Sequence, residues 1–204
     1  REYASIKFFL YTLFGSILIL IVFILLYISS YNPAEMMEYV PANMDTIKSI
    51  QDAVQAGSLP DKQHIIHSLD IIQLSNPVNY LPGSLLSDSN IIVVLGYSIR
   101  TWCFIALLIG FLIKLPAFPF HTWLPDAHVE APTAVSVVLA GILLKIGGYG
   151  LIRIVWPLFP QGAADASWWV GLIGVVTIIY AAFVALAQTD LKKMIAYSSV
   201  SHMG

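Results

Sequence analysis

Four apolar runs, each long enough to cross a lipid bilayer as a helix, dominate this chain of 204 residues. A helix needs about 20 apolar residues to cross the hydrocarbon core, where every backbone polar group must be hydrogen-bonded within the protein. We therefore predict an all-α polytopic membrane protein. The composition agrees with this class, because 58% of the residues are hydrophobic and only 11% are charged. The predicted spans cover about residues 7–29, 97–123, 133–156 and 168–187, and a fifth begins near Lys193.

The predicted spans belong to a single membrane domain. Residues 1–30 hold its first helix, residues 31–96 an extracytoplasmic loop, and residues 97–204 the second to fourth helices and the start of the fifth. The first residue is not Met and the last lies within an apolar pattern, so we expect both ends to be cuts in a longer protein.

Cationic residues beside the spans predict the orientation of the chain. An even number of crossings separates one pair from the other, so both pairs lie on one side of the membrane. By the positive-inside tendency that side is the cytoplasm. The polar turn over residues 116–132 lies on the same side. The two pairs are Arg1 with Lys7 and Lys192 with Lys193.

Lys114 and Lys145 each lie inside an apolar run, where an ammonium group is costly. A charge at the centre of a bilayer costs roughly 3 kcal/mol on insertion scales, so such residues usually face a polar interior and mark a path for ions or protons. Lys145 lies about twelve residues into its span, near the midplane at ~1.5 Å rise per residue, so its side chain cannot easily reach water.

A proline break follows Lys114, because the sequence KLPAFP removes the backbone donors of Pro116 and Pro119 where the helix should continue. In a membrane the freed carbonyl groups must meet protein or water, which suggests a cavity close to Lys114. Transporters often have such discontinuous helices at their ion-binding sites. The alternative is a kink near the membrane surface, with the side chain of Lys114 extending to water.

Two histidines and two carboxylates gather in the turn after the break, namely His121, Asp126, His128 and Glu130. An imidazole titrates near neutral pH and a carboxylate can be tuned toward it, so these groups are suited to relay protons. Asp126 and Glu130 equally lie just ahead of the third span, where acidic side chains stabilise a helix N-terminus. The sequence alone leaves both interpretations open.

Other candidate ligands do not form a convincing metal site. His64 and His67 have a spacing found at metal sites, but no Cys or carboxylate completes the set. Cys103 is the single cysteine and lies in an apolar run, so it forms no intrachain disulfide and holds no metal or cluster alone. We expect no metal and no cofactor in this chain, and its net charge of -2 gives no support for nucleic-acid binding.

Three segments carry a family resemblance, namely residues 114–133 (KLPAFPFHTWLPDAHVEAPT), 139–153 (LAGILLKIGGYGLIR) and 188–204 (QTDLKKMIAYSSVSHMG). They closely resemble the antiporter-like subunits of respiratory complex I (NADH:quinone oxidoreductase) of the subunit M or mitochondrial chain 4 type. The resemblance covers about residues 1–30 and 97–204, whereas the loop is longer than the family pattern. It implies a fragment of an inverted-repeat helix bundle with a broken transmembrane helix. The membrane would be one that transduces energy, either a bacterial cytoplasmic membrane or an organelle inner membrane.

The resemblance also implies proton translocation through particular residues. Lys114 matches the lysine of the family's broken helix, Lys145 its central lysine, and His202 a histidine farther along the route. His121 and His128 are further candidates for proton transfer. The acidic partner of Lys114 would lie on a helix outside these 204 residues.

The energy for translocation would come from partner subunits, because the sequence holds no nucleotide, flavin or cluster motif. The resemblance implies other membrane-arm subunits as partners, with membrane lipids, protons and internal water, and it puts quinone, FMN and iron–sulfur clusters in those other subunits. An antiporter-like subunit of a multisubunit cation/proton antiporter or membrane-bound hydrogenase is an alternative that shares the lysines. A passive membrane scaffold is another, which would explain glycine-rich packing but not two buried lysines.

Overall fold

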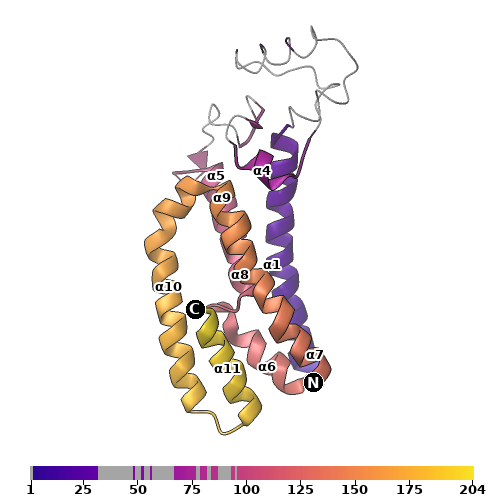
Figure 1. Ribbon diagram of the computed structural model, residues 1–204, viewed down its shortest axis with the longest axis vertical. Helices are drawn as coiled ribbons and strands as arrows, with labels where there is room; N and C mark the ends of the chain where they lie inside the picture. The colour runs from indigo at the N-terminus through magenta and orange to yellow at the C-terminus, as the bar shows by residue number, and fades with distance from the viewer. Residues whose placement is uncertain are drawn as a thin grey trace. The chain divides into compact units, whose positions relative to one another are not determined.

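The computed structural model describes residues 2–31, 67–76, 79–81, 84–86, 93–94 and 96–204, together with Lys48, Asp52 and Ala56. The chain divides into two compact units, one made of residues 1–19 and 104–204 and the other of residues 20–103. Most of the described residues are helical, and the strands among them form one short antiparallel pair (Figure 1).

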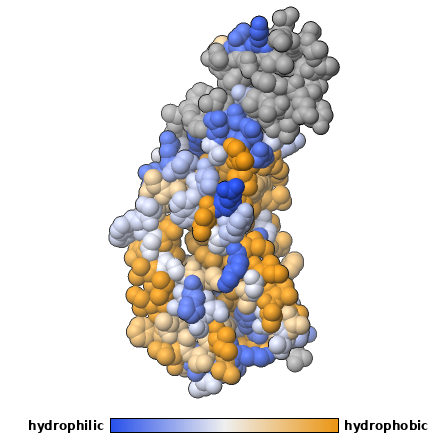
Figure 2. All heavy atoms as spheres, in the orientation of Figure 1, coloured by the Kyte–Doolittle hydropathy of each residue, from blue (hydrophilic) through white to orange (hydrophobic). Residues whose placement is uncertain are grey.

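Three helices in the described part of the chain are long and apolar enough to cross a membrane. They are α1 (Glu2–Ser29), the continuous helix Thr133–Leu158 and α10 (Pro160–Leu186). The prediction of an all-α, multi-pass membrane protein is therefore confirmed. Hydrophobic side chains cover much of the helical part of the chain on the face that Figure 2 shows, as suits surfaces that meet lipid or further apolar helices.

The second predicted span is a broken helix. α5 (Ile99–Lys114) stops at the predicted lysine, a 3-10 turn η3 (Phe120–Thr122) follows the break, and α6 (Trp123–Glu130) begins where the span was predicted to end. The turn predicted over 116–132 is thus mostly helical. The reason is that Pro125 lies in the first turn of α6, where a helix needs no backbone donor from it.

The third predicted span is one continuous helix made of five pieces. Its α-helical pieces are α7 (Thr133–Val138), α8 (Leu144–Gly150) and α9 (Trp156–Leu158), and the π-helical turns η4 (Leu139–Leu143) and η5 (Leu151–Val155) join them. π turns within α-helices are rare and frequently occur at functional sites. Lys145 lies on the piece between the two π turns.

α10 and α11 (Leu191–Met203) form the last helical pair. α10 begins at Pro160, before the start predicted at 168, because proline favours the first position of a helix and the polar residues that follow can be helical outside the bilayer. The carboxylate of Asp190 caps α11 by accepting the backbone N–H of Lys192 at 2.8 Å. Figure 1 shows the two helices side by side, joined by a short turn.

The core of the first unit lies where the segment after the break meets the third span and the helices α10 and α11. Phe8 of α1 packs its ring against Trp123, with 5.3 Å between the ring centroids. Burial of these side chains therefore holds α6 in place after the chain has left α5. The buried core residues are Trp123, Leu124, Leu139, Leu144, Ala181 and Val200.

In the second unit the chain returns to the end of α1. Ser30 pairs with Tyr80 in an antiparallel bridge, and the Ser30 hydroxyl donates to the carbonyl of Ser68 at 3.0 Å. These bonds attach part of the predicted loop to the helix. The other elements of this unit are α4 (Ile71–Leu74) and the antiparallel strands β1 (Val93–Val94) and β2 (Tyr97–Ser98).

Candidate functional site

Lys114 is the last residue of α5, and its side chain is half-buried beside the break. Within the described residues its ammonium makes no hydrogen bond or ion pair. The ammonium is therefore expected to pair with a group, or to be solvated by water, outside the part of the chain described.

Two backbone groups at the break are hydrogen-bonded by buried side chains. The indole N–H of Trp123 donates to the carbonyl of Ile113 at 2.9 Å, and the backbone N–H of Phe118 donates to Oγ1 of Thr177 at 3.0 Å. Both Trp123 and Thr177 are buried. Irregular backbone is tolerated in a membrane only when its polar groups are satisfied in this way, so the break is a built part of the fold.

Two glycines bring the third span against the break. A Cβ on Gly147 would lie 2.7 Å from the backbone nitrogen of Leu115, and one on Gly150 would collide with the ring of Phe111. Only glycine permits so close an approach of two backbones. The helix that carries Lys145 therefore packs directly on the point where α5 ends at Lys114.

Lys145 itself lies on an exposed face of α8. Its neighbours on that face are Ile142, Ile146 and Tyr149, each of which is exposed in this chain. Tyr149 lies four residues after Lys145, on the same helical face, and both side chains are exposed. A lysine on an apolar face of a membrane helix needs a polar surrounding supplied by other helices or by water.

His202 lies in the last turn of α11 and is exposed. It is at the edge of a hollow of about 540 Å³ that also borders the break at Leu115 and Ala117 and the third span at Gly148. The structure therefore brings His202 to the break, whereas Lys145 does not line this hollow.

His121 is almost fully buried in an aromatic cluster, with 3% of its surface exposed. The centroid of its ring lies 5.9 Å from that of Phe118, 5.2 Å from that of Tyr180 and 6.3 Å from that of Tyr197. Its Nδ1 is buried and has no hydrogen-bond partner among the described residues. Buried polar atoms without a partner are uncommon and point to water or to function.

His128 lies beside a second hollow, of about 230 Å³. Its Nδ1 is 2.6 Å from Oγ of Ser136, and its buried Nε2 has no partner in the described part of the chain. Lys192 and Ser199 line the same hollow. A space this large, with several polar groups around it, is able to hold ordered water.

Both imidazoles lie outside the three helices that are long enough to span the membrane. Burial lowers the pKa of His121, and the nearby charge of Lys7 lowers it further. Burial also lowers the pKa of His128. Both shifts favour the neutral imidazole, which has one nitrogen that can accept a proton.

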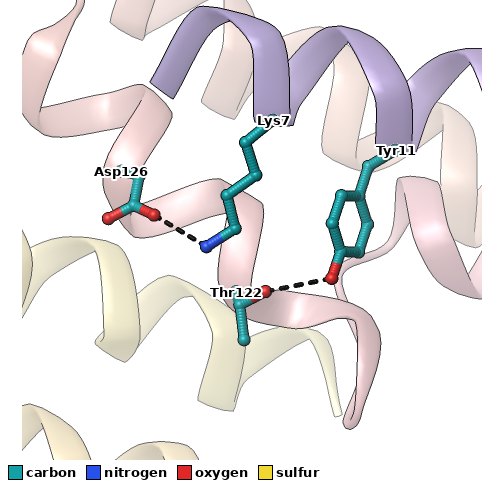
Figure 3. A network of polar contacts seen from close by, with 4 residues as sticks. All are labelled: Lys7, Tyr11, Thr122 and Asp126. Atoms are coloured by element: carbon teal, nitrogen blue, oxygen red, sulfur yellow. Dashed lines mark hydrogen bonds and ion pairs between the residues drawn. The ribbon is translucent and has the colours of Figure 1, made fainter. Parts of the chain in front are cut away.

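Asp126, one of the two carboxylates of the turn, belongs to α6 and not to the start of the third span. The cap residue of α7 is Pro132, which supplies no side-chain hydrogen bond. Asp126 instead lies in the first turn of α6 and accepts a hydrogen bond from the ammonium of Lys7 at 2.8 Å (Figure 3). From the sequence Lys7 is only a charge that flanks the first span, because no local signal joins two residues that are 119 positions apart.

The predicted pair of loop histidines is described only in part. His64 lies outside the described residues, whereas the Nδ1–H of His67 donates to the carbonyl of Ser30 at 2.8 Å. Across the described ranges, no group of three or more His, Cys, Asp or Glu side chains is arranged to hold a metal ion.

Residues 72–204 match a family described as NADH:quinone oxidoreductase/Mrp antiporter, transmembrane. Over its full length the chain is 40% identical to NADH-quinone oxidoreductase subunit M of Rickettsia prowazekii, of which it covers 31%, and 38% identical to that of Rhodobacter capsulatus, of which it covers 32%. It is also 61% identical over 103 residues, half of this chain and 20% of the relative, to F(420)H(2) dehydrogenase subunit M of Methanosarcina mazei. These relatives confirm the resemblance drawn from the three sequence segments.

The chain spans about a third of the length of the curated subunit M proteins that it matches. A solved structure, respiratory complex I from Thermus thermophilus with bound NADH, contains a chain that is 24% identical with a TM-score of 0.49. That match covers 95% of this chain and 38% of the other.

Proposed function

The chain belongs to the NADH:quinone oxidoreductase/Mrp antiporter transmembrane family, and on that premise we propose that it translocates protons in the membrane arm of an NADH:quinone oxidoreductase. The observation that carries the proposal is the break after Lys114. A half-buried ammonium lies where α5 ends, and buried side chains from other parts of the chain satisfy the backbone around it. A passive scaffold has no need of such a site.

In this proposal Lys114 exchanges a proton with an acidic group that other parts of the subunit supply. A nearby carboxylate favours the ammonium form of a lysine, and desolvation disfavours it. Movement of the carboxylate therefore switches the lysine between holding and releasing its proton. Moving one charge against 100 mV requires about 2.3 kcal/mol, which corresponds to a change in proton affinity of less than about two pKa units at ~1.4 kcal/mol each.

The remaining candidates extend the route on both sides of Lys114. Lys145 passes the proton on near the membrane midplane, and His202 continues it from the hollow beside the break. His128 and His121 give access from the turn, since each has a buried nitrogen without a partner among the described residues. Water in the hollow at His128 would connect that imidazole to Lys192 and Ser199.

The energy for this transport comes, in our proposal, from redox chemistry in partner subunits. Quinone, FMN and iron–sulfur clusters are expected there and not in this chain, and the partners are the other membrane-arm subunits. A second candidate function is transport in a related complex that uses a different electron donor or no redox chemistry at all. The family includes Mrp antiporters, and the relative from Methanosarcina mazei is a subunit of an F(420)H(2) dehydrogenase.

The test is to replace Lys145 by Met in the full-length subunit within its complex. Met keeps much of the length and apolar volume of the side chain but has no titrating nitrogen, so the complex should assemble and lose most of its proton pumping. Lys145→Arg should also fail, because a guanidinium stays protonated throughout a cycle. Pumping is measured with a pH-sensitive dye in reconstituted vesicles, beside a quinone-reduction assay.

Lys193→Met is the matched control, because Lys193 is an exposed lysine in the first turn of α11 and lines neither hollow. It should pump normally. Normal pumping by Lys145→Met would exclude Lys145 as an obligatory proton carrier. Normal quinone reduction without pumping would show that the subunit moves protons and that the two processes are loosely coupled.

A further inference from the structure

Two polar contacts join α1 to the segment that follows the break (Figure 3). The ammonium of Lys7 donates to Oδ2 of Asp126 at 2.8 Å, and the hydroxyl of Tyr11 lies 3.3 Å from that of Thr122. The spacing is four residues on both sides, so the two contacts lie one helical turn apart and act on the same pair of elements. The side chain of Lys7 is only 18% exposed and that of Asp126 36%, which shields the pair partly from water.

These contacts matter because α6 is not continuous with α5. Beyond the break, the position of the segment is set by side chains and not by helical hydrogen bonds. The ring of Trp123 against Phe8 supplies the apolar part of that attachment, and the pair of Lys7 and Asp126 supplies the charged part.

His121 is at the centre of this arrangement, next to Thr122 in the chain. The rings of Tyr180 on α10 and Tyr197 on α11 lie against it, and the charge of Lys7 on α1 acts on it. Tyr11 of α1 contacts its neighbour Thr122, and Asp126 of α6 is the ion-pair partner of Lys7. Of these, Lys7 and Asp126 are the two that carry charge at neutral pH.

We propose that Lys7 and Asp126 are positioning residues, which hold the segment of His121 against α1 and set the net charge beside its imidazole. The inference rests on the proton-transfer role proposed above for His121. While the pair is intact the carboxylate of Asp126 offsets part of the effect of the ammonium, so removing either charge should change the pH at which the imidazole gains or loses a proton.

A charge effect and a purely structural effect can be separated by the direction of the response. Asp126→Asn leaves the ammonium of Lys7 uncompensated, which disfavours the imidazolium of His121 and should move its titration to lower pH. Lys7→Met leaves the carboxylate uncompensated and should move the titration to higher pH. If the pair were only a structural attachment, both variants would change the activity in the same direction.

The experiment measures the pH dependence of proton pumping by the complete complex in vesicles. We expect the midpoint to fall by about half a pH unit or more in Asp126→Asn and to rise by a similar amount in Lys7→Met, as expected for one charge at a partly screened site. The double variant Lys7→Met, Asp126→Asn removes both charges and should return the midpoint close to the original. It also keeps the test decisive if a single variant fails to assemble, because it leaves no unpaired charge.

Shifts in the same direction in the two single variants, or a double variant whose midpoint stays displaced, would overturn the inference. His121→Gln tests the premise separately. If that variant pumps with an unchanged pH profile, the role of His121 in the proposed function is wrong. If His121→Gln abolishes the pH dependence of pumping while the Lys7 and Asp126 variants leave its midpoint unchanged, only the inference about the pair fails.

Discussion

At the break, Thr177 and Trp123 each supply one hydrogen bond that a continuous helix would have supplied from its own backbone. A buried N–H or carbonyl left without a partner costs about 1–3 kcal/mol, so each of these side chains contributes more through the group it satisfies than through its own packing. Thr177 also donates its hydroxyl to the carbonyl of Ile173 at 2.7 Å, which orients the oxygen toward Phe118. The backbone geometry beside Lys114 therefore depends on two side chains that carry no charge.

Replacing Thr177 by Val tests this dependence. Valine has nearly the same shape but cannot accept the N–H of Phe118, so the variant should lose about 1–3 kcal/mol of stability and some of its pumping activity. Thr177→Ser keeps the hydroxyl and is the matched control. The thermal inactivation midpoint of the purified complex and its pumping rate report on both variants. Identical behaviour of Val and Ser would show that the hydroxyl has no role at the break.

The close approach of α8 to the break is a property of two elements and not of one residue. Gly147 faces the backbone of Leu115 with no side chain between them, and Gly150 faces the ring of Phe111. The contact transmits any displacement of one helix directly to the other, because a close-packed interior has no free space to absorb it.

Gly147→Ala should separate the two helices, since its methyl group would meet the Leu115 nitrogen at 2.7 Å and backbone cannot yield as a flexible side chain does. We expect a loss of stability of about 1–3 kcal/mol, as is typical of overpacking, and reduced pumping. Gly148→Ala is the control on the same helix, because its methyl group would make only an ordinary contact with Leu115 at 3.5 Å. A stable, active Gly147→Ala variant would mean that the approach is not needed.

How far the sequence predicts these elements depends on how local each signal is. The prolines at 116 and 119 lie beside Lys114, so the break was predictable from a few neighbouring residues. The partner of Asp126 and the acceptor for Phe118 lie 119 and 59 positions away, and only the fold brings them together. The π turns beside Lys145 were not predicted either, because nothing in their sequences, LAGIL and LIRIV, distinguishes a π turn from an α turn.

The chain exposes large apolar side chains on its surface, and their contact with water would be unfavourable. Ile152 is 76% exposed, Phe183 69% and Leu186 83%, and all three lie on helices long enough to span a bilayer. Since the chain has about a third of the length of its relatives, these faces are suited to contact lipid or further helices of a longer subunit.

The orientation predicted from the cationic flanks can be tested by labelling. In a Cys103→Ala background, cysteines placed at Lys48 and Lys193 should react with a membrane-impermeant maleimide from opposite sides, because three crossings separate the two positions. Lys193→Cys should react from the cytoplasmic side. Reaction of both from the same side would mean that the broken helix does not cross the membrane.

The hydrogen bonds around Ile113 and Phe118 make the break after Lys114 a permanent feature of the helix. To become one straight helix, the segment would have to release Trp123 and Thr177 from their present partners. It would still lack donors at Pro116 and Pro119, so the exchange would lose bonds without replacing them. The break should therefore be present in every stage of the proposed transport cycle. What changes from stage to stage must be sought in the side chains, the water and the neighbouring helices that meet there.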